Sequence, residues 1–231
     1  MSQPIAHQPA LLFDLDGTLV DSVYQHVLAW RTALEEAGIA LSVWRIHRRI
    51  GMSGGLFVQA LVRETGCALA PEEARRLQDA HARAYLAQHQ QVRPLPGARE
   101  LLQHLTESGL RWAIATSGSQ RTASPALALL DLPGETVVVT RDQVPFAKPD
   151  PHLFLAAAER LSVDVQNALV VGDSVWDMLA AQRARALGVG LLSGGYGREE
   201  LERAGAFRVY NDPADLHAHL DELGIRVPNA L

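Results

Sequence analysis

The chain has 231 residues, of which 48% are hydrophobic and 20% are charged, so it can form a folded core and is not a disordered chain. Its net charge of −5 disfavours non-specific binding to nucleic acid or to an anionic membrane. The single cysteine, Cys67, excludes an internal disulfide and a cysteine-based zinc site. The first nine residues do not resemble a secretory signal, and the apolar runs are shorter than the roughly 18 residues of a membrane span, so we expect a cytoplasmic protein.

Short apolar runs alternate with helical stretches along most of the chain. This alternation predicts βαβ units and a mostly parallel sheet that is buried on both faces. The expected strands lie at residues 10–13, 110–115, 136–139, 168–171, 189–192 and 208–210. The helices expected between the later strands lie at residues 98–107, 122–130, 152–161 and 175–187.

One segment interrupts the alternation, because residues 21–91 contain no convincing strand. Apolar residues at helical spacing predict a helix from residue 23 that ends near Gly38, and further helices are expected at 41–49, 54–65 and 71–89. The fold class is therefore α/β: a Rossmann-like core formed by residues 1–20 and 92–231, with an all-helical domain of residues 21–91 inserted after the first strand.

Polar side chains follow four of the expected core segments. In an open parallel sheet, ligands bind beyond the carboxyl ends of the strands, so these side chains are expected to share one crevice. They belong to Asp14 and Asp16, to Thr116-Ser117-Gly118, to Lys148, and to Asp173 and Asp177.

The acidic residues of this set indicate a metal site. Asp14 and Asp16 lie two residues apart and would repel each other, and Asp173 adds a third oxygen donor. An all-oxygen cluster without cysteine suits Mg²⁺. Asp177 follows Asp173 by one helical turn and either supports it or is solvated.

The other polar residues suit an anion. Thr116-Ser117-Gly118 offers hydroxyls and backbone N–H groups for an oxyanion, although ordinary capping of a helix also explains it. Lys148 is the only lysine beside 20 arginines, which favours a site that needs a compact ammonium.

These motifs, in this order, resemble those of the haloacid dehalogenase superfamily, and in particular its phosphoglycolate phosphatase and β-phosphoglucomutase-like branch. The run from Asp14 to Ser22 resembles the first motif, and the helical insertion resembles the type-one cap. Thr116 or Ser117, Lys148, and Gly172-Asp173 with Asp177 resemble the remaining motifs. The one departure is Ala147, where glycine is usual before the lysine.

The resemblance implies a phosphatase that works through an aspartyl phosphate. Asp14 would be the nucleophile and Asp16 the general acid and base. Mg²⁺ would bind Asp14, the backbone carbonyl of Asp16 and Asp173, with Asp177 in support. Thr116 and Lys148 would hold the phosphoryl oxygens.

The substrate is expected to be a small phosphorylated metabolite, of the phosphoglycolate or sugar phosphate type. The core would contact it through Gly17, Ser117 and Gly118, and the insertion through His26, Arg49 and Ser53. Arg45, Arg48 and Arg49 have the spacing of one helix face, and solvent exposure and substrate contact both remain open for them. The protein is expected to be a monomer or a weak homodimer.

Three other activities of the family can be compared with these residues. A haloacid dehalogenase lacks the second aspartate of the first motif, which Asp16 supplies here, and a phosphonoacetaldehyde hydrolase needs a cap lysine, which residues 21–91 do not contain. A β-phosphoglucomutase is the main alternative, although the arginine that follows its Gly-x-Ser is replaced here by Gly54, after Gly51-Met52-Ser53.

A phospho-acceptor signalling module, such as a receiver domain, is a remote alternative. It also places an acidic Mg²⁺ pocket, a hydroxyl and a lysine at strand ends. Receivers are about half as long as this chain and have no insertion of 70 residues, so the sequence favours an enzyme.

Overall fold

The computed structural model describes residues 9–66 and 69–226. The expectation of no internal disulfide rests on Cys67, and the expectation of no secretory signal rests on the first nine residues. Cys67 and residues 1–8 lie outside the described range. The strands are β1 Ala10–Phe13, β2 Val20–Asp21, β3 Arg93–Pro94, β4 Trp112–Ala115, β5 Val137–Val139, β6 Ala168–Gly172, β7 Leu187–Leu191 and β8 Ala206–Tyr210. The α-helices are α1 Val23–Glu36, α2 Val43–His47, α3 Gly54–Thr65, α4 Pro71–Leu86, α5 Ala98–Glu107, α6 Gln120–Leu127, α7 His152–Arg160, α8 Val175–Ala184, α9 Arg198–Arg203 and α10 Pro213–Ala218.

Six strands form a parallel sheet in the order β5-β4-β1-β6-β7-β8. The first strand is central, because Leu12 pairs with Ala113 of β4 on one side and with Val170 of β6 on the other. All four residues of β1 are buried, as expected for a continuously apolar strand in the middle of a parallel sheet. The expected α/β class with a Rossmann-like sheet is confirmed.

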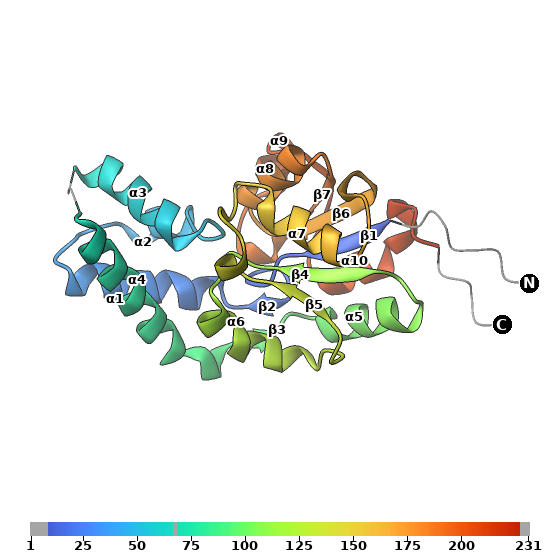
Figure 1. The fold of residues 1–231 in the computed structure, drawn as a ribbon, viewed down its shortest axis with the longest axis horizontal. Helices are drawn as coiled ribbons and strands as arrows, with labels where there is room; N and C mark the ends of the chain where they lie inside the picture. Colours follow the sequence, from blue (N-terminus) through green and yellow to red (C-terminus); the bar gives the residue numbers. More distant parts are fainter. Residues whose placement is uncertain (1–8, 67–68, 227–231) are drawn as a thin grey trace, which may run out of the picture.

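Helices cover both faces of the sheet (Figure 1). Leu11 and Phe13 of β1 pack on one face, in a core cluster that includes residues of α5, α6 and α10. Leu12 points to the opposite face and packs with residues of α7 and α8. Alternate residues of one strand therefore build two cores.

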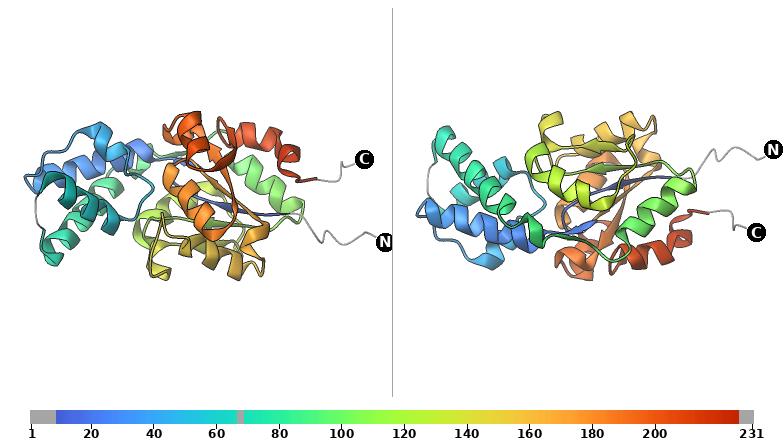
Figure 2. Two further views of the ribbon diagram at one scale, coloured as in Figure 1. Left: turned by 90° about the horizontal axis from the view of Figure 1, so that it is seen from above. Right: turned by 90° about the horizontal axis from the view of Figure 1, so that it is seen from below.

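The helical insertion, with helices α1–α4, lies at one end of the molecule, beside the α/β core (Figure 2). Its helices α1–α4 enclose a separate apolar cluster that contains Trp30, Phe57 and Leu61. The chain enters and leaves it through β2 and β3, which pair antiparallel with Val20 opposite Pro94. This arrangement places the insertion beyond the carboxyl end of β1.

The element bounds differ from the prediction in a few places. The helix expected at 175–187 ends at Ala184, because Arg185 adopts a left-handed conformation (φ 61°) and β7 begins at Leu187. The pair β2–β3 was not predicted, since two-residue strands leave no periodic pattern. In the part of the chain that the structure describes, no helix is both long enough and apolar enough to cross a membrane.

Candidate active site

The predicted strand-end residues meet at the carboxyl edge of the sheet. Asp14 directly follows β1, and its N–H donates to the carbonyl of Val171 in β6 at 2.8 Å. Thr116 follows β4, and its N–H donates to the carbonyl of Val139 in β5 at 2.9 Å. The backbone hydrogen bonds of the parallel sheet thus continue into the site and fix the positions of Asp14 and Thr116.

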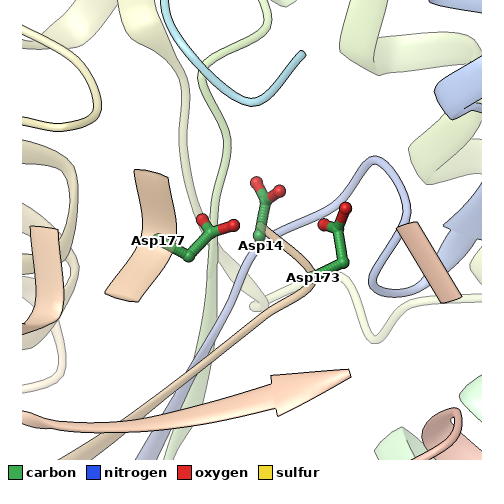
Figure 3. Close-up of side chains that lie close together, drawn as sticks. All are labelled: Asp14, Asp173 and Asp177. Atoms are coloured by element: carbon green, nitrogen blue, oxygen red, sulfur yellow. The ribbon is translucent and has the colours of Figure 1, made fainter. Parts of the chain in front are cut away.

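Three buried carboxylates form the centre of the site. Asp14, Asp173 and Asp177 each offer an oxygen atom, and these atoms all lie within 4.8 Å of one another. Figure 3 shows the three side chains next to one another; they come from the ends of β1 and β6 and from the start of α8. Their side chains are almost without solvent contact.

Lys148 is the cation of this centre. Its ammonium contacts the carboxylate of Asp14, and it lies 2.8 Å from Oδ1 of Asp177. The side chain is fully buried, and its Nζ lies 5.2 Å from the centre of the Phe154 ring. Asp14, Lys148, Asp173 and Asp177 together carry two more negative than positive charges when all are ionised.

The excess negative charge shifts the pKa values of the cluster. Burial, which outweighs the attraction of Lys148, raises the pKa of Asp14 to about 7, and Asp177 and Asp16 add to the rise. Burial and the charges of Asp177 and Asp14 raise the pKa of Asp173 well above its usual value. Burial lowers the pKa of Lys148, but the two carboxylates it contacts raise it overall.

A divalent cation fits this set of residues. Several oxygen donors at one buried point are the ligands that Mg²⁺ takes in proteins, and a second positive charge would offset the repulsion that raises the pKa values of Asp14 and Asp173. These residues could therefore hold a divalent metal.

The immediate neighbours hold two of the carboxylates in place. Thr18 Oγ1 donates to Oδ1 of Asp173 at 2.9 Å. The backbone N–H and hydroxyl of Ser174 donate to Oδ2 of Asp177 at 3.1 and 2.5 Å. Gly17 has φ of 83°, and a Cβ atom there would lie 2.5 Å from Oδ2 of Asp173, so both conformation and space require glycine.

Asp16 lies apart from the three-carboxylate cluster. Its Oδ1 accepts from the hydroxyl of Ser22 at 2.6 Å and lies 3.2 Å from Nε2 of His26. Although burial opposes it, the interactions with His26 and Ser22 hold the pKa of Asp16 below its usual value. Across the described residues, all hydrogen bonds to this carboxylate go to Oδ1, so Oδ2 is available to a ligand.

A cavity of about 320 Å³ lies between the core and the helical insertion. Seven of the predicted residues line it, and Ser117 Oγ is one of the buried side-chain atoms that find no hydrogen-bond partner within the described part of the chain. The hydroxyl of Thr116 accepts from the N–H of Gly118 at 2.9 Å. The seven residues are Asp14, Asp16, His26, Arg49, Thr116, Ser117 and Gly118.

The remaining predicted residues are not part of the cavity lining. Gly17, Lys148, Asp173 and Asp177 lie in or beside the buried cluster that Asp14 connects to the cavity. Ser53 is buried at the start of α3: its hydroxyl accepts from the N–H of Leu56 at 3.4 Å, and its own N–H donates to the carbonyl of Lys148 at 3.4 Å. A substrate contact of Ser53 stays a prediction.

The three arginines that were expected to share a helix face have different partners. Arg45 and Arg49 both contact the carboxylate of Glu64 within the insertion. Arg48 instead contacts Glu200 of the core, and its guanidinium lies 4.0 Å from the centre of the Tyr196 ring. Each arginine is therefore engaged with a protein carboxylate.

Sequence reasoning missed several cavity residues. Gln78, Asp79 and His81 come from α4, and Arg121 and Arg141 come from the core. Arg121 lies 3.8 Å from Asp79, so these two residues approach each other across the boundary between core and insertion. The spacing of these residues carries no motif, because which face of α4 meets the core depends on how the insertion packs.

Comparison with known proteins agrees with this fold and site. The model of the haloacid dehalogenase-like hydrolase family matches residues 9–185. Phosphoglycolate phosphatase of Rhodospirillum rubrum is 34% identical over 215 residues, 90% of this chain and 88% of that protein. Hexitol phosphatase A of Escherichia coli is 34% identical over 175 residues, 75% of this chain and 78% of that protein. The crystal structure of a hydrolase from Pseudomonas syringae superposes with a TM-score of 0.92 at 55% identity, over 94% of this chain and 99% of that one.

The chain therefore belongs to the haloacid dehalogenase-like hydrolase family. The expected enzyme class, a phosphatase of that family, is confirmed.

Proposed function

We propose that the protein is a Mg²⁺-dependent phosphatase that hydrolyses a small phosphorylated metabolite through an aspartyl-phosphate intermediate. The observation that carries this proposal is the position of Asp14, which lines the cavity while its carboxylate contacts Lys148 in the buried cluster. A substrate in the cavity can thus reach the carboxylate of Asp14, whose negative charge is stabilised by the buried ammonium of Lys148.

Asp14 is the nucleophile in this proposal. A carboxylate oxygen attacks phosphorus, the bond from phosphorus to the leaving oxygen breaks, and a phosphorylated Asp14 results. The nucleophile must be ionised, and Lys148 favours the ionised form against the effect of burial. Water then attacks phosphorus and restores the free carboxylate.

Asp16 serves both half-reactions as a proton carrier. Its Oδ2 accepts no hydrogen bond from any residue that the structure describes, and Asp16 lines the same cavity as Asp14. Protonated Asp16 gives its proton to the leaving oxygen, and the resulting carboxylate later takes a proton from the attacking water. One side chain two residues from the nucleophile therefore balances the protons of both steps.

The metal would be held by Asp14, Asp173 and the backbone carbonyl of Asp16, with Asp177 beside it. When bound, Mg²⁺ supplies positive charge that reduces the repulsion between the carboxylate of Asp14 and an anionic phosphoryl group. Asp177 is already engaged with Lys148 and Ser174, which supports a positioning role for it.

The phosphoryl oxygens would be bound by Lys148 and by the hydroxyls of Thr116 and Ser117. The N–H groups of Gly17 and Gly118 already donate to the Val20 carbonyl and the Thr116 hydroxyl, so a substrate contact of these two glycines stays a prediction. Ser117 offers a hydroxyl that has no hydrogen-bond partner in residues 9–66 and 69–226, and Lys148 offers an ammonium between two carboxylates. Donors placed where charge develops in the transition state are a large source of catalysis.

The helical insertion would act as a cap domain of residues 21–91 on a core of residues 1–20 and 92–231. It carries its own apolar cluster, connects to the core through β2 and β3, and supplies one wall of the cavity. Closure of such a cap excludes water from the reacting groups.

The substrate is of the phosphoglycolate or sugar phosphate type, as the names of the two relatives suggest. His26 and Arg49 are the residues of the insertion that were predicted to contact it and that line the cavity. A cytoplasmic location and a monomeric or weakly dimeric state remain predictions.

The arginine contacts favour phosphatase over mutase activity. A mutase must hold a second phosphate, and because Gly54 stands where the mutases have an arginine after Ser53, Arg48 or Arg49 would have to take that role here. Arg48 is bound to Glu200 and Arg49 to Glu64, so neither offers an unpaired guanidinium to a second anionic group.

A panel of phosphate monoesters tests the proposal. Phosphoglycolate, hexitol phosphates and hexose phosphates are incubated with Mg²⁺, and free phosphate is measured for the wild-type protein and for Asp14→Asn. Multiple turnovers by the wild type and none by the variant support the proposal. Hydrolysis by the variant at the wild-type rate contradicts it, and isomerised hexose phosphate in place of free phosphate supports the mutase.

A single phosphate released per chain, without further turnover, would instead support a phospho-acceptor module. The assay therefore separates all three functions in one series of measurements.

A further inference from the structure

Two histidines of the insertion form a chain of contacts that ends at Asp16. His26, on α1, has its Nε2 atom 3.2 Å from Oδ1 of Asp16. Its other ring nitrogen, Nδ1, lies 3.1 Å from Nε2 of His81 on α4. Both distances are those of hydrogen bonds, so a continuous path joins α4 to Asp16 through His26.

Aromatic packing fixes the orientation of both imidazole rings. The His26 ring stacks on the Tyr85 ring with centroids 3.8 Å apart and planes inclined by 5°. The His81 ring stacks on Trp30 at 4.2 Å and 16°, and Trp30 stacks on Phe57 at 4.0 Å and 18°. Because each ring is held by a neighbouring face, neither can rotate without loss of packing.

The contacts of His26 engage both of its ring nitrogens. Nε2 faces Oδ1 of Asp16, and because a carboxylate oxygen only accepts, this nitrogen is the donor. Nδ1 faces Nε2 of His81, and one of these two nitrogens donates to the other in a direction that depends on the tautomers. The contact with His81 therefore holds the His26 ring in the orientation that directs its Nε2 atom at Asp16.

This arrangement also decides which oxygen of Asp16 faces the substrate. Oδ1 is occupied by Ser22 and His26, and a Cβ atom built at Gly118 would lie 3.8 Å from Oδ2. Gly118 is one of the cavity-lining residues, so Oδ2 is on the side of the carboxylate from which a leaving oxygen can approach.

We propose that His81 is a positioning residue: through His26 it holds the Asp16 carboxyl with Oδ2 toward the cavity for proton transfer. The inference rests on the proposed function, in which Asp16 protonates the leaving oxygen. It also implies that Asp16 is fully held only when the insertion is closed on the core, because His26 and His81, which hold it, belong to the insertion.

The test compares two substitutions of His81 on two substrates. His81→Phe retains a stacking ring and removes the hydrogen-bonding nitrogen, whereas His81→Gln retains a hydrogen-bonding group without the ring. The substrates are an alkyl phosphate that the wild type hydrolyses, whose alkoxide must be protonated to leave, and p-nitrophenyl phosphate, whose phenolate leaves without a proton. The ratio kcat/KM reports the steps up to release of the leaving group.

We expect His81→Phe to lower kcat/KM for the alkyl phosphate by about 10-fold, a part of what general acid catalysis contributes. The loss for p-nitrophenyl phosphate should be several-fold smaller, and His81→Gln should recover most of the alkyl phosphate activity. In the Asp16→Asn background the substitution of His81 should have little additional effect. His104→Phe, at a histidine of α5 outside the cavity, is the matched control.

An equal loss on both substrates, or a loss in His81→Gln as large as in His81→Phe, would mean that His81 acts through packing and would overturn the inference. Thermal melts of each variant show whether it is folded. The proposed function fails separately, if the wild type does not turn over either phosphate ester with Mg²⁺.

Discussion

Charged side chains behave differently in the strand-end cluster and in the helical insertion. In the cluster, Lys148 and Asp177 are fully buried and contact each other. Arg48 of the insertion and its partner Glu200 of the core retain 36% and 41% of their side-chain exposure. Buried charges that lose a partner cost about 3–5 kcal/mol, whereas exposed ion pairs contribute about 0–1 kcal/mol. Substitutions in the cluster should therefore have much larger effects than substitutions of the arginines.

The largest effect is expected at the nucleophile. Asp14→Asn should reduce turnover to background, because an amide is a poor nucleophile and no other carboxylate both lines the cavity and contacts Lys148 among the described residues. Phosphate release with Mg²⁺ measures the effect. Asp221→Asn, at an exposed position of the core, is the control and should retain wild-type turnover.

Removal of the metal should have a similarly large effect. EDTA should abolish turnover, and added Mg²⁺ should restore it. Mg²⁺ should also raise the Tm of the protein, because a ligand that binds only the native state stabilises it. Asp173→Asn should weaken this shift by removing one ligand. Full activity in EDTA would exclude the proposed metal dependence.

Lys148 tests whether a compact charge is required. Lys148→Met should lower kcat by about 10²-fold or more, as loss of a group that stabilises developing charge does. Lys148→Arg should be nearly as damaging, because the buried space between Asp14 and Asp177 is filled by an ammonium and is bounded by the Phe154 ring. Steady-state kinetics of the two variants decide the question, and wild-type activity of the arginine variant would contradict it.

The smallest effect is expected for the contact of Arg48 with the core. Arg48→Ala removes an ion pair with Glu200 and a cation–π contact with Tyr196, so we expect kcat/KM to fall by only a few-fold. Arg45→Ala is the matched control, because Arg45 contacts Glu64 inside the insertion and should change kcat/KM less. Equal effects of the two substitutions would mean that the Arg48 contact does not hold the insertion on the core.

The sequence allowed the sheet and the strand-end residues to be predicted for a physical reason. Buried parallel strands are continuous apolar runs, such as Ala168-Leu169-Val170-Val171, and the polar residue after each run necessarily lies at the same edge of the sheet. The approach of Asp14 to Asp173 follows from the register of β1 and β6 alone.

The contacts of the insertion could not be predicted in this way. Helical spacing placed Arg45, Arg48 and Arg49 on one face, but the partner of Arg48 lies 152 residues away in the core. His81 has no motif around it, and its approach to His26 depends on how α1 and α4 pack. Side-chain partners between packed helices are set by tertiary structure, which one sequence does not specify.

The most direct test of the central claim is the detection of phosphate on Asp14 during turnover. The enzyme is mixed with Mg²⁺ and a hydrolysed substrate, quenched in acid within the first turnover, digested and examined by mass spectrometry. We predict that the peptide that contains Asp14 carries the mass of one phosphoryl group, and that this signal is absent in Asp14→Asn. A wild-type enzyme that turns over without phosphorylation of this peptide, or with the label on another residue, would contradict the account.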